Sequence, residues 1–204
     1  KLLSAEFGND LVNHRTWVFA SDGDLMEGIG SEAASLAGHL RLGNLNVVYD
    51  NNHITIDGRT SLSFSEDVPR RFEGYRWHTL AVPDGNDLEA IHKAIREAEA
   101  ETERPSLIAV RTVIGYGAPR KQGTHEAHGE PLGPDGVRAA KRFYGWPEDA
   151  EFLVPHGVVE HFAESIGERG RAAREAWAAT FEGYRSAFPD LADEIERMQR
   201  RELP

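Results

Sequence analysis

The chain has 204 residues, of which 40% are hydrophobic, so it can bury the core of one domain with an appendage. Asp and Glu outnumber Lys and Arg by 34 to 23, a formal charge of −11, and no basic run follows a phosphate backbone, so nucleic acid is not an expected partner. The absence of cysteine excludes disulfides, thiolate zinc sites and a cysteine nucleophile, and it is compatible with the cytoplasm. No apolar stretch has membrane-spanning length.

The first part of the sequence alternates strand-like and helix-like segments. Its opening residues, KLLSAEF, are typical of the middle of a helix and resemble no signal peptide, so we expect the sequence to begin inside a longer chain. Residues 16–20 predict a buried strand, because they are mostly β-branched or aromatic, and the acidic turn 21–24 follows. Beyond Gly28, apolar residues recur at helical spacing and predict a helix; they are Ile29, Ala33, Leu36, Ala37 and Leu40.

The following segments repeat this alternation. Further strands are predicted at 45–49, 77–82 and 106–114, and a helix with one apolar face is predicted over residues 88–98. The alternation indicates an α/β fold, a mostly parallel sheet with helices on both faces. In such a fold the loops that leave the carboxyl ends of the strands gather at one edge. Three polar loops are of this kind, at 21–28, 50–58 and 115–130.

The pattern changes near residue 130. Short helical segments separated by Gly and Pro follow, and the sequence ends in the highly charged DLADEIERMQRREL and Pro204. We therefore predict two parts. An α/β domain that lacks its beginning occupies residues 1–130, and a helical arm or linker occupies residues 131–204.

Asp22 and Asn52 lie thirty residues apart, and each follows a predicted strand. A carboxylate and a carboxamide oxygen that meet at the edge of a sheet suit Mg²⁺ or Ca²⁺. Gly23 would let a phosphate approach the backbone, and the helix that begins near Gly28 would direct N–H groups toward a diphosphate. Taken singly, each motif is more simply a helix cap or a polar loop, but their combination at this spacing favours a metal and diphosphate site.

These residues resemble a known signature. Asp22-Gly23 followed by Asn52 resembles the thiamine-diphosphate motif, which begins Gly-Asp-Gly and ends in paired Asn or in Asp-Asn. Longer segments are similar to transketolases, nearly collinearly over residues 19–133 and more loosely to the end: DGDLMEGIGSEAASLAGHLRLGNL, VVYDNNHITIDG, RFEGYRWH and GTHEAHGEPLG. Deoxyxylulose-phosphate synthase and the first component of pyruvate dehydrogenase share only the short signature. Peroxisomal dihydroxyacetone synthase, a close relative of transketolase, fits these motifs as well.

The resemblance implies a thiamine-diphosphate-binding fold and roles for particular residues. Thiamine diphosphate and Mg²⁺, or Ca²⁺, would be the cofactors. The implied metal ligands are Asp22, Asn52 and the carbonyl of Ile54. The implied diphosphate contacts are Gly23 and Asn52, and Ile114 would pack near the cofactor. One departure is Ser21, which stands where the signature usually has Gly.

The loop GTHEAHG contains two histidines, His125 and His128. The chain has no cysteine and no H-E-x-x-H motif, so a structural zinc site is not expected there. A solvated loop with inert histidines is the simplest alternative. The transketolase resemblance instead places His128 against the cofactor and the sugar substrate, as a catalytic and substrate-binding residue, with His125 as the second candidate.

The resemblance also implies a reaction and partners. Transketolases move a two-carbon glycolaldehyde unit from a ketose phosphate to an aldose phosphate, in the pentose phosphate pathway of the cytoplasm. Their active site is built from two polypeptides, and this chain corresponds only to the diphosphate half. We therefore expect it to need a complementary pyrimidine-binding domain or chain, to form a homodimer as the complete enzyme, and to be inactive alone.

Two alternatives remain open. A haloacid-dehalogenase-type phosphatase would use Asp22 as nucleophile and Asp24 as acid, although Leu25 and Met26 do not fit that family and no later pair of Asp residues completes its metal site. The chain would otherwise be a non-catalytic subunit of a split thiamine-diphosphate enzyme, with the same site and a different partner.

Overall fold

The computed structural model describes residues 1–203, and the contacts between residues divide the chain into two units. One unit is His14–Ala150, and the other combines Lys1–Asn13 with Glu151–Pro204. Residues 131–150 thus belong by their contacts to the α/β unit, whereas the sequence predicts a boundary at residue 130. The reason is aromatic packing: Phe143 packs edge-on against Tyr116 of the third loop at 5.5 Å between ring centroids.

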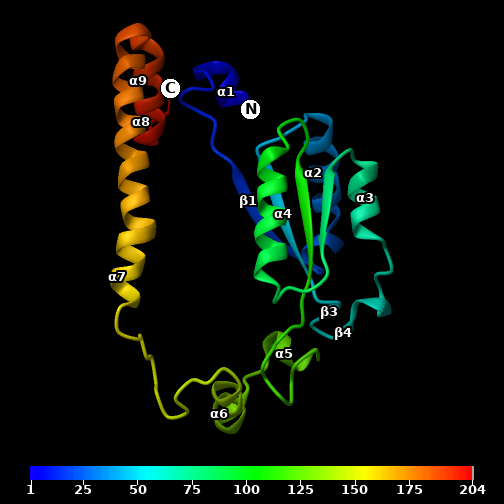
Figure 1. Ribbon diagram of the computed structural model, residues 1–204. Coiled ribbons are helices and arrows are strands. Elements are labelled where there is room, and N and C mark those ends of the chain that lie inside the picture. The colour runs from blue at the N-terminus through cyan, green and yellow to red at the C-terminus, as the bar shows by residue number, and fades with distance from the viewer. Residues whose placement is uncertain (204) are drawn as a thin grey trace. The chain divides into compact units, whose positions relative to one another are not determined.

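The α/β unit is built on a four-stranded sheet in the order β1-β2-β6-β5. Every neighbouring pair is parallel, which confirms the predicted fold class (Figure 1). The strands are β1 (Thr16–Ser21), β2 (Leu45–Asn51), β5 (His78–Val82) and β6 (Ser106–Arg111). The last predicted strand is therefore shorter than expected, since residues 112–114 already belong to the loop that follows β6.

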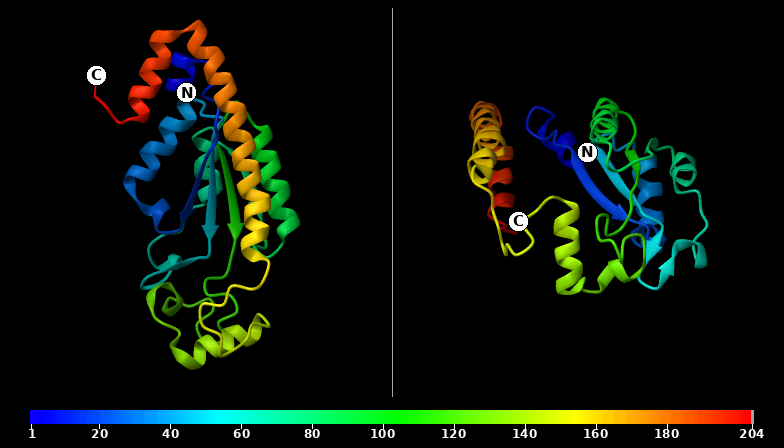
Figure 2. Two further views of the ribbon diagram at one scale, coloured as in Figure 1. Left: turned by 90° about the vertical axis from the view of Figure 1, so that its left-hand side faces the viewer. Right: turned by 60° about the horizontal axis from the view of Figure 1, so that its bottom comes forward.

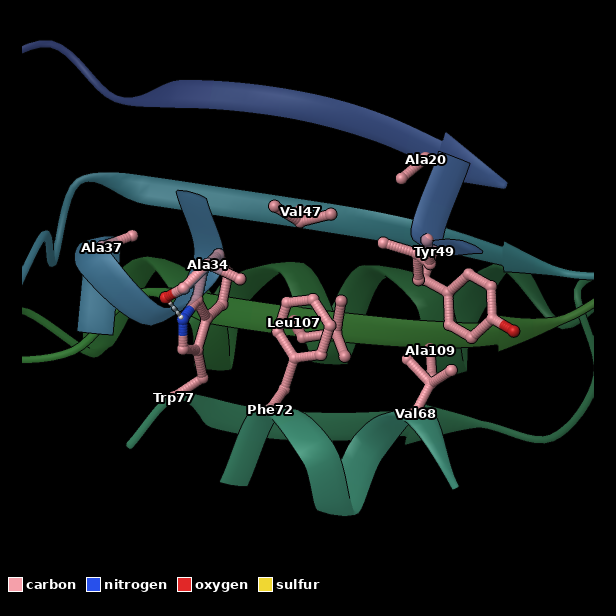
Figure 3. Packing of buried hydrophobic residues seen from close by; sticks show 11 residues of the cluster. Ala20, Ala34, Ala37, Val47, Tyr49, Val68, Phe72, Trp77, Leu107 and Ala109 are labelled. Atoms are coloured by element: carbon pink, nitrogen blue, oxygen red, sulfur yellow. Dashed lines mark hydrogen bonds between the residues drawn. The ribbon is translucent and has the colours of Figure 1, made fainter. Parts of the chain in front are cut away.

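Two helices, α2 (Gly28–His39) and α3 (Val68–Gly74), cover one face of this sheet. Phe72 of α3 packs edge-on against Trp77 at 4.9 Å between ring centroids, and the indole N–H of Trp77 donates a hydrogen bond of 2.8 Å to the carbonyl of Ala34 in α2 (Figure 3). The cluster continues along the sheet to Tyr49, whose hydroxyl lies at the far end from Trp77 in Figure 3. This face therefore holds the larger core.

The opposite face is covered by α4 (Leu88–Ala100). Asp87 caps this helix, since its side chain accepts a hydrogen bond from the N–H of Ala90. Ala94 and Ala98 are buried against apolar residues of the sheet, which are Val82, Ile108 and Val110. The prediction of helices on both faces is confirmed.

The apolar spacing that predicts α2 does not mark its buried face. The buried residues are small, namely Ala34, Ala37 and Gly38, and they allow the helix to lie close to its neighbours. Ile29 and Leu36 are 76% and 57% exposed, and Phe19 of the edge strand β1 is 82% exposed. The outer side of α2 therefore exposes apolar side chains, and Phe19 is exposed at the edge of the sheet.

Short elements gather at the carboxyl edge of the sheet. The left view of Figure 2 shows them beyond the ends to which the strand arrows point. They are the 3-10 turns η1 (Asp24–Met26) and η2 (Thr60–Leu62), the hairpin β3 (Ile54–Thr55) and β4 (Gly58–Arg59), and the helices α5 (Glu126–Gly129) and α6 (Gly133–Phe143). The three polar loops named from the sequence contribute to this edge, because β1, β2 and β6 are neighbours in the sheet.

The second unit is helical. It contains α1 (Leu2–Phe7), α7 (Val158–Phe162), the π turn η3 (Ala163–Gly167), α8 (Glu168–Ala187) and α9 (Pro189–Gln199). Its core joins Leu11 to Phe181 and Ala192, and the indole N–H of Trp177 donates a hydrogen bond of 3.1 Å to the carbonyl of Leu11. Among residues 1–203, no helix is both long and apolar enough to span a membrane.

Candidate functional site

The carboxylate of Asp22 lies where β1 and β2 end. Asp22 follows β1 directly and is only 2% exposed. Its Oδ2 accepts hydrogen bonds from the backbone N–H groups of Asn52 at 3.1 Å and His53 at 2.8 Å. Its Oδ1 accepts a hydrogen bond of 2.6 Å from the hydroxyl of Tyr49. The structure thus brings Asp22 and Asn52 together, through the backbone of Asn52.

A tight turn after β2 positions Asn52 and Ile54. The Oδ1 of Asn52 accepts a hydrogen bond of 2.8 Å from the N–H of Ile54, in the manner of an Asx turn. Between them, His53 has a left-handed backbone with φ of 62°. Such a backbone is uncommon for residues other than glycine, although His, Asn and Asp adopt it more often than the others. The turn fixes the direction of both the Asn52 side chain and the Ile54 carbonyl.

In the acidic turn after β1, Ser21 forms hydrogen bonds to Asp24, and the space beside Gly23 is empty. The N–H and the hydroxyl of Ser21 each donate a hydrogen bond of 2.8 Å to Oδ2 of Asp24. Gly23 has φ of −62° and ψ of −44°, which any residue adopts, and a Cβ there would meet no atom within 4 Å. Neither the backbone nor the packing of this chain requires glycine at position 23. The space beside it is open to a ligand, as the predicted approach of a phosphate demands.

Arg71 of α3 anchors the same turn from the side of the core. Its Nη2 donates a hydrogen bond of 2.9 Å to the carbonyl of Leu25, and its Nη1 lies 2.7 Å from the carboxylate of Glu66. The guanidinium also lies 5.8 Å from the ring centroid of Phe64 and 5.7 Å from that of Phe72. The turn that carries Asp22 is therefore tied to α3 as well as to β2.

Tyr49 is a residue of the site that the sequence analysis did not identify. It is 3% exposed, and burial, followed by the hydrogen bond to Asp22, raises the pKa of its hydroxyl far above the ordinary value. The hydroxyl therefore donates as a neutral group. A signal was present in the sequence, because a tyrosine in a buried strand needs a partner for its hydroxyl.

The donor set at Asp22 fits a hard divalent cation. A carboxylate has about four lone-pair sites, and the three hydrogen bonds to Asp22 leave one free. Within residues 1–203, Asp22 forms no ion pair with a Lys, Arg or His, so its buried negative charge has no cationic partner from the chain. Asn52 retains a second lone pair on Oδ1, and the Ile54 carbonyl adds another oxygen.

A cavity of about 450 Å³ adjoins this carboxylate. Asp22, Tyr49 and His53 line one side, and residues 60–69 contribute to the other. Over the described chain, no three His, Asp or Glu side chains converge to hold a metal. A cation at Asp22 would therefore depend on amide, carbonyl, water or ligand oxygens for the rest of its coordination shell.

The third loop, residues 115–130, contains a backbone hydrogen bond between one of its glycines and the residue that precedes the loop. The carbonyl of Ile114 accepts a hydrogen bond of 2.8 Å from the N–H of Gly123, which turns the loop back toward β6. His125 precedes α5 and His128 lies within it, and both side chains are exposed. Among residues 1–203, neither histidine forms a hydrogen bond or ion pair with Asp22 or with Asn52. The structure places this loop at the same edge of the sheet without direct contact to Asp22.

Comparisons with known proteins point to one family. The family described as "Transketolase, thiamine diphosphate binding domain" matches residues 2–204. The transketolase of Streptococcus pyogenes is 50% identical over 198 residues, which are 96% of this chain and 27% of that protein. The transketolase of Geobacillus stearothermophilus is 47% identical over 197 residues, which are 97% of this chain and 30% of that protein.

Solved structures agree with the sequence relatives. The transketolase from Leishmania mexicana superposes with a TM-score of 0.93 at 39% identity, over 99% of this chain and 30% of that chain. A transketolase from Pichia stipitis, in complex with sedoheptulose-7-phosphate, gives a TM-score of 0.87 at 41% identity, over 93% of this chain and 28% of that chain. The chain thus spans less than a third of the length of these relatives.

Proposed function

The chain belongs to the transketolase family, and from this premise we propose that it supplies the diphosphate- and metal-binding half of a transketolase active site. The observation that carries the proposal is the buried carboxylate of Asp22, which contacts Asn52, has a free lone pair and lacks a cationic partner among the described residues. A divalent cation would offset this buried charge.

In this proposal Asp22, Asn52 and the carbonyl of Ile54 bind Mg²⁺ or Ca²⁺. Asn52 would also contact the diphosphate, for which the open side of Gly23 leaves room. The hard oxygen donors and the empty space beside Gly23 support these roles. The positive end of α2, which begins at Gly28, adds to the attraction for the anion.

His128 and Ile114 belong to the part of the site that faces the cofactor and the substrate. Ile114 lies in the turn that begins the third loop and would pack against the cofactor. His128 is exposed on α5, where its imidazole is free to donate a hydrogen bond to a diphosphate or to an oxygen of a sugar. We assign the catalytic and substrate-binding role to His128 and keep His125 as the second candidate.

Thiamine diphosphate, when bound, supplies the carbanion chemistry by which a two-carbon glycolaldehyde unit passes from a ketose phosphate to an aldose phosphate. The residues of this chain bind and orient the cofactor, and His128 contacts the sugar. Sugar phosphates are the substrate class that relatives support, since the Pichia stipitis enzyme has been solved with sedoheptulose-7-phosphate. We place the reaction in the cytoplasm, in the pentose phosphate pathway.

The chain would act with a second, pyrimidine-binding domain or chain. The exposed apolar side chains Ile29 and Leu36 of α2 support this expectation, because an apolar surface of this kind marks a contact with another protein. By itself the chain is expected to show no turnover, and the complete enzyme is expected to be a homodimer. A non-catalytic subunit of a split enzyme would use the same surface.

The family match does not favour the phosphatase alternative. In that alternative Asp22 must attack a phosphate and Asp24 must protonate the leaving group. Here Oδ2 of Asp24 is held by the N–H and the hydroxyl of Ser21. The roles of Asp22 and Asp24 are therefore better explained by cation binding and by closure of the turn.

Calorimetry with thiamine diphosphate and Mg²⁺ tests the proposal. The native chain, alone at high concentration and then mixed with the pyrimidine-binding domain of a related transketolase, should bind the cofactor only when Mg²⁺ is present. Asp22→Ala should abolish this binding, whereas Asp10→Ala, which removes an exposed carboxylate of the other unit, should leave it unchanged. Absence of binding by the native chain in both settings, or equal binding by Asp22→Ala, would show that the assignment is wrong.

A further inference from the structure

Tyr49 joins the core of the sheet to the carboxylate of Asp22. Its ring belongs to the larger apolar cluster (Figure 3). Its hydroxyl donates to Oδ1 of Asp22 at 2.6 Å and lies 3.3 Å from Oδ1 of Asn51. We propose that Tyr49 is a positioning residue that orients the Asp22 carboxylate for the metal ion. This inference rests on the proposed function, because it requires Asp22 to bind the metal.

The two oxygens of Asp22 are held in different ways. Oδ2 accepts from two neighbouring backbone N–H groups, those of Asn52 and His53. These contacts fix the position of one oxygen and leave the carboxylate free to rotate about it. The Tyr49 hydroxyl is the described partner of Oδ1, so it fixes the plane of the carboxylate and the direction of the remaining lone pair.

The position of Tyr49 is itself fixed by the sheet. β2 lies between β1 and β6, and Tyr49 pairs with Ala20 on one side and Ala109 on the other. Both partners are small, so the tyrosine ring has room to lie across the neighbouring strands. Val68 and Phe72 of α3 belong to the same buried cluster. The hydroxyl therefore reaches Asp22 from a rigid, close-packed base, as a metal ligand with fixed geometry requires.

The simpler interpretation is a buried tyrosine whose hydroxyl needs any acceptor. In that case removal of the hydroxyl would lower the stability of the fold and leave metal binding unchanged. In our proposal it weakens the binding of Mg²⁺, and a higher Mg²⁺ concentration compensates for the loss. The two interpretations thus differ in how cofactor affinity depends on the metal.

Tyr49→Phe keeps the ring and removes only the hydroxyl. Tyr75→Phe is the matched control, since Tyr75 packs on the same cluster and its hydroxyl has no hydrogen-bond partner among the described residues. The affinity for thiamine diphosphate is measured by calorimetry over a series of Mg²⁺ concentrations, with the full chain and the added pyrimidine-binding domain. At limiting Mg²⁺, we expect Tyr49→Phe to lose roughly tenfold or more in affinity and to recover at high Mg²⁺, while Tyr75→Phe stays within about twofold.

A double-mutant cycle locates the effect. If Tyr49 acts through Asp22, Tyr49→Phe should have no further effect on affinity in an Asp22→Asn background. Equal affinities of Tyr49→Phe and Tyr75→Phe, or a loss that Mg²⁺ does not restore, would overturn the inference while Asp22→Ala still supports the metal site. Unchanged binding by Asp22→Ala would instead overturn the proposed function, and this inference with it.

Discussion

Gly38 of α2 lies directly against the backbone carbonyl of Tyr75, so that a Cβ built on Gly38 would be 1.8 Å from this oxygen. We predict that Gly38→Ala destabilises the chain by about 3 kcal/mol or more, because the obstructing atom belongs to the backbone and α2 would have to move. Gly28→Ala is the control in the same helix, since a Cβ there meets nothing within 4 Å. Urea unfolding should show a change within about 0.5 kcal/mol for the control.

Replacement of Arg71 even by lysine should lower the stability of the chain. Arg71→Lys removes the planar group that contacts both Leu25 and Glu66, and a hydrogen bond to a charged group in a largely buried site contributes about 2 kcal/mol. Its neighbour Arg70 has a side chain that is 82% exposed and that pairs, among residues 1–203, only with Asp67, so Arg70→Lys should change stability by less than about 0.5 kcal/mol. Equal unfolding midpoints for the two variants would contradict the anchoring role of Arg71.

The left-handed backbone at His53 predicts that glycine at this position destabilises the chain less than valine does. His53→Val should cost about 1–2 kcal/mol, because a β-branched residue resists positive φ, whereas His53→Gly should stay within about 1 kcal/mol of the native chain. His14→Val, at an exposed position outside this turn, serves as the control. Thermal unfolding of the four proteins checks the order, and a valine variant at position 53 that is as stable as the glycine variant would disprove it.

Ser21 stands where related signatures have glycine, and its hydroxyl closes the acidic turn on Asp24. Ser21→Ala removes this hydrogen bond and should lower stability by about 1 kcal/mol, while the bond from the backbone N–H remains. Ser63→Ala, an exposed control, should have no measurable effect on the urea midpoint. If Ser21→Ala is also neutral, the hydroxyl does not hold the turn in solution.

The open apolar surface should govern association. Ile29→Glu places a charge on it and should abolish self-association or binding to a pyrimidine-binding domain, as measured by sedimentation velocity. Leu88→Glu is the matched control, because Leu88 is 75% exposed at the start of α4, which covers the opposite face of the sheet. Both variants should keep the circular dichroism spectrum of the native chain, and loss of association in both would mean that added charge alone is responsible.

Much of the fold could be predicted from local patterns. Residues 16–20 and 45–49 are mostly apolar or β-branched runs, so β1 and β2 could be located, and the parallel sheet followed from the helices between strands. The prediction that residues 16–20 form a buried strand is wrong, because β1 is the edge strand of the sheet and has no neighbouring strand to cover its outer side. The buried face of α2 could not be predicted, because its larger apolar residues, such as Ile29, suggest the wrong side. Close packing selects small residues there instead, because Gly38 lies against the carbonyl of Tyr75 and the carbonyl of Ala34 accepts a hydrogen bond from Trp77.

The candidate site divides in the same way. The sequence by itself determined the residue types and the family, because the spacing of Asp22, Gly23 and Asn52 can be read directly from the order of residues. Only the tertiary structure decided which groups hold the Asp22 carboxylate. Tyr49 lies 27 residues away in the chain and meets Asp22 at 2.6 Å, because adjacent parallel strands bring their ends to one edge. Contacts across strands depend on register and packing, which no local pattern of residues encodes.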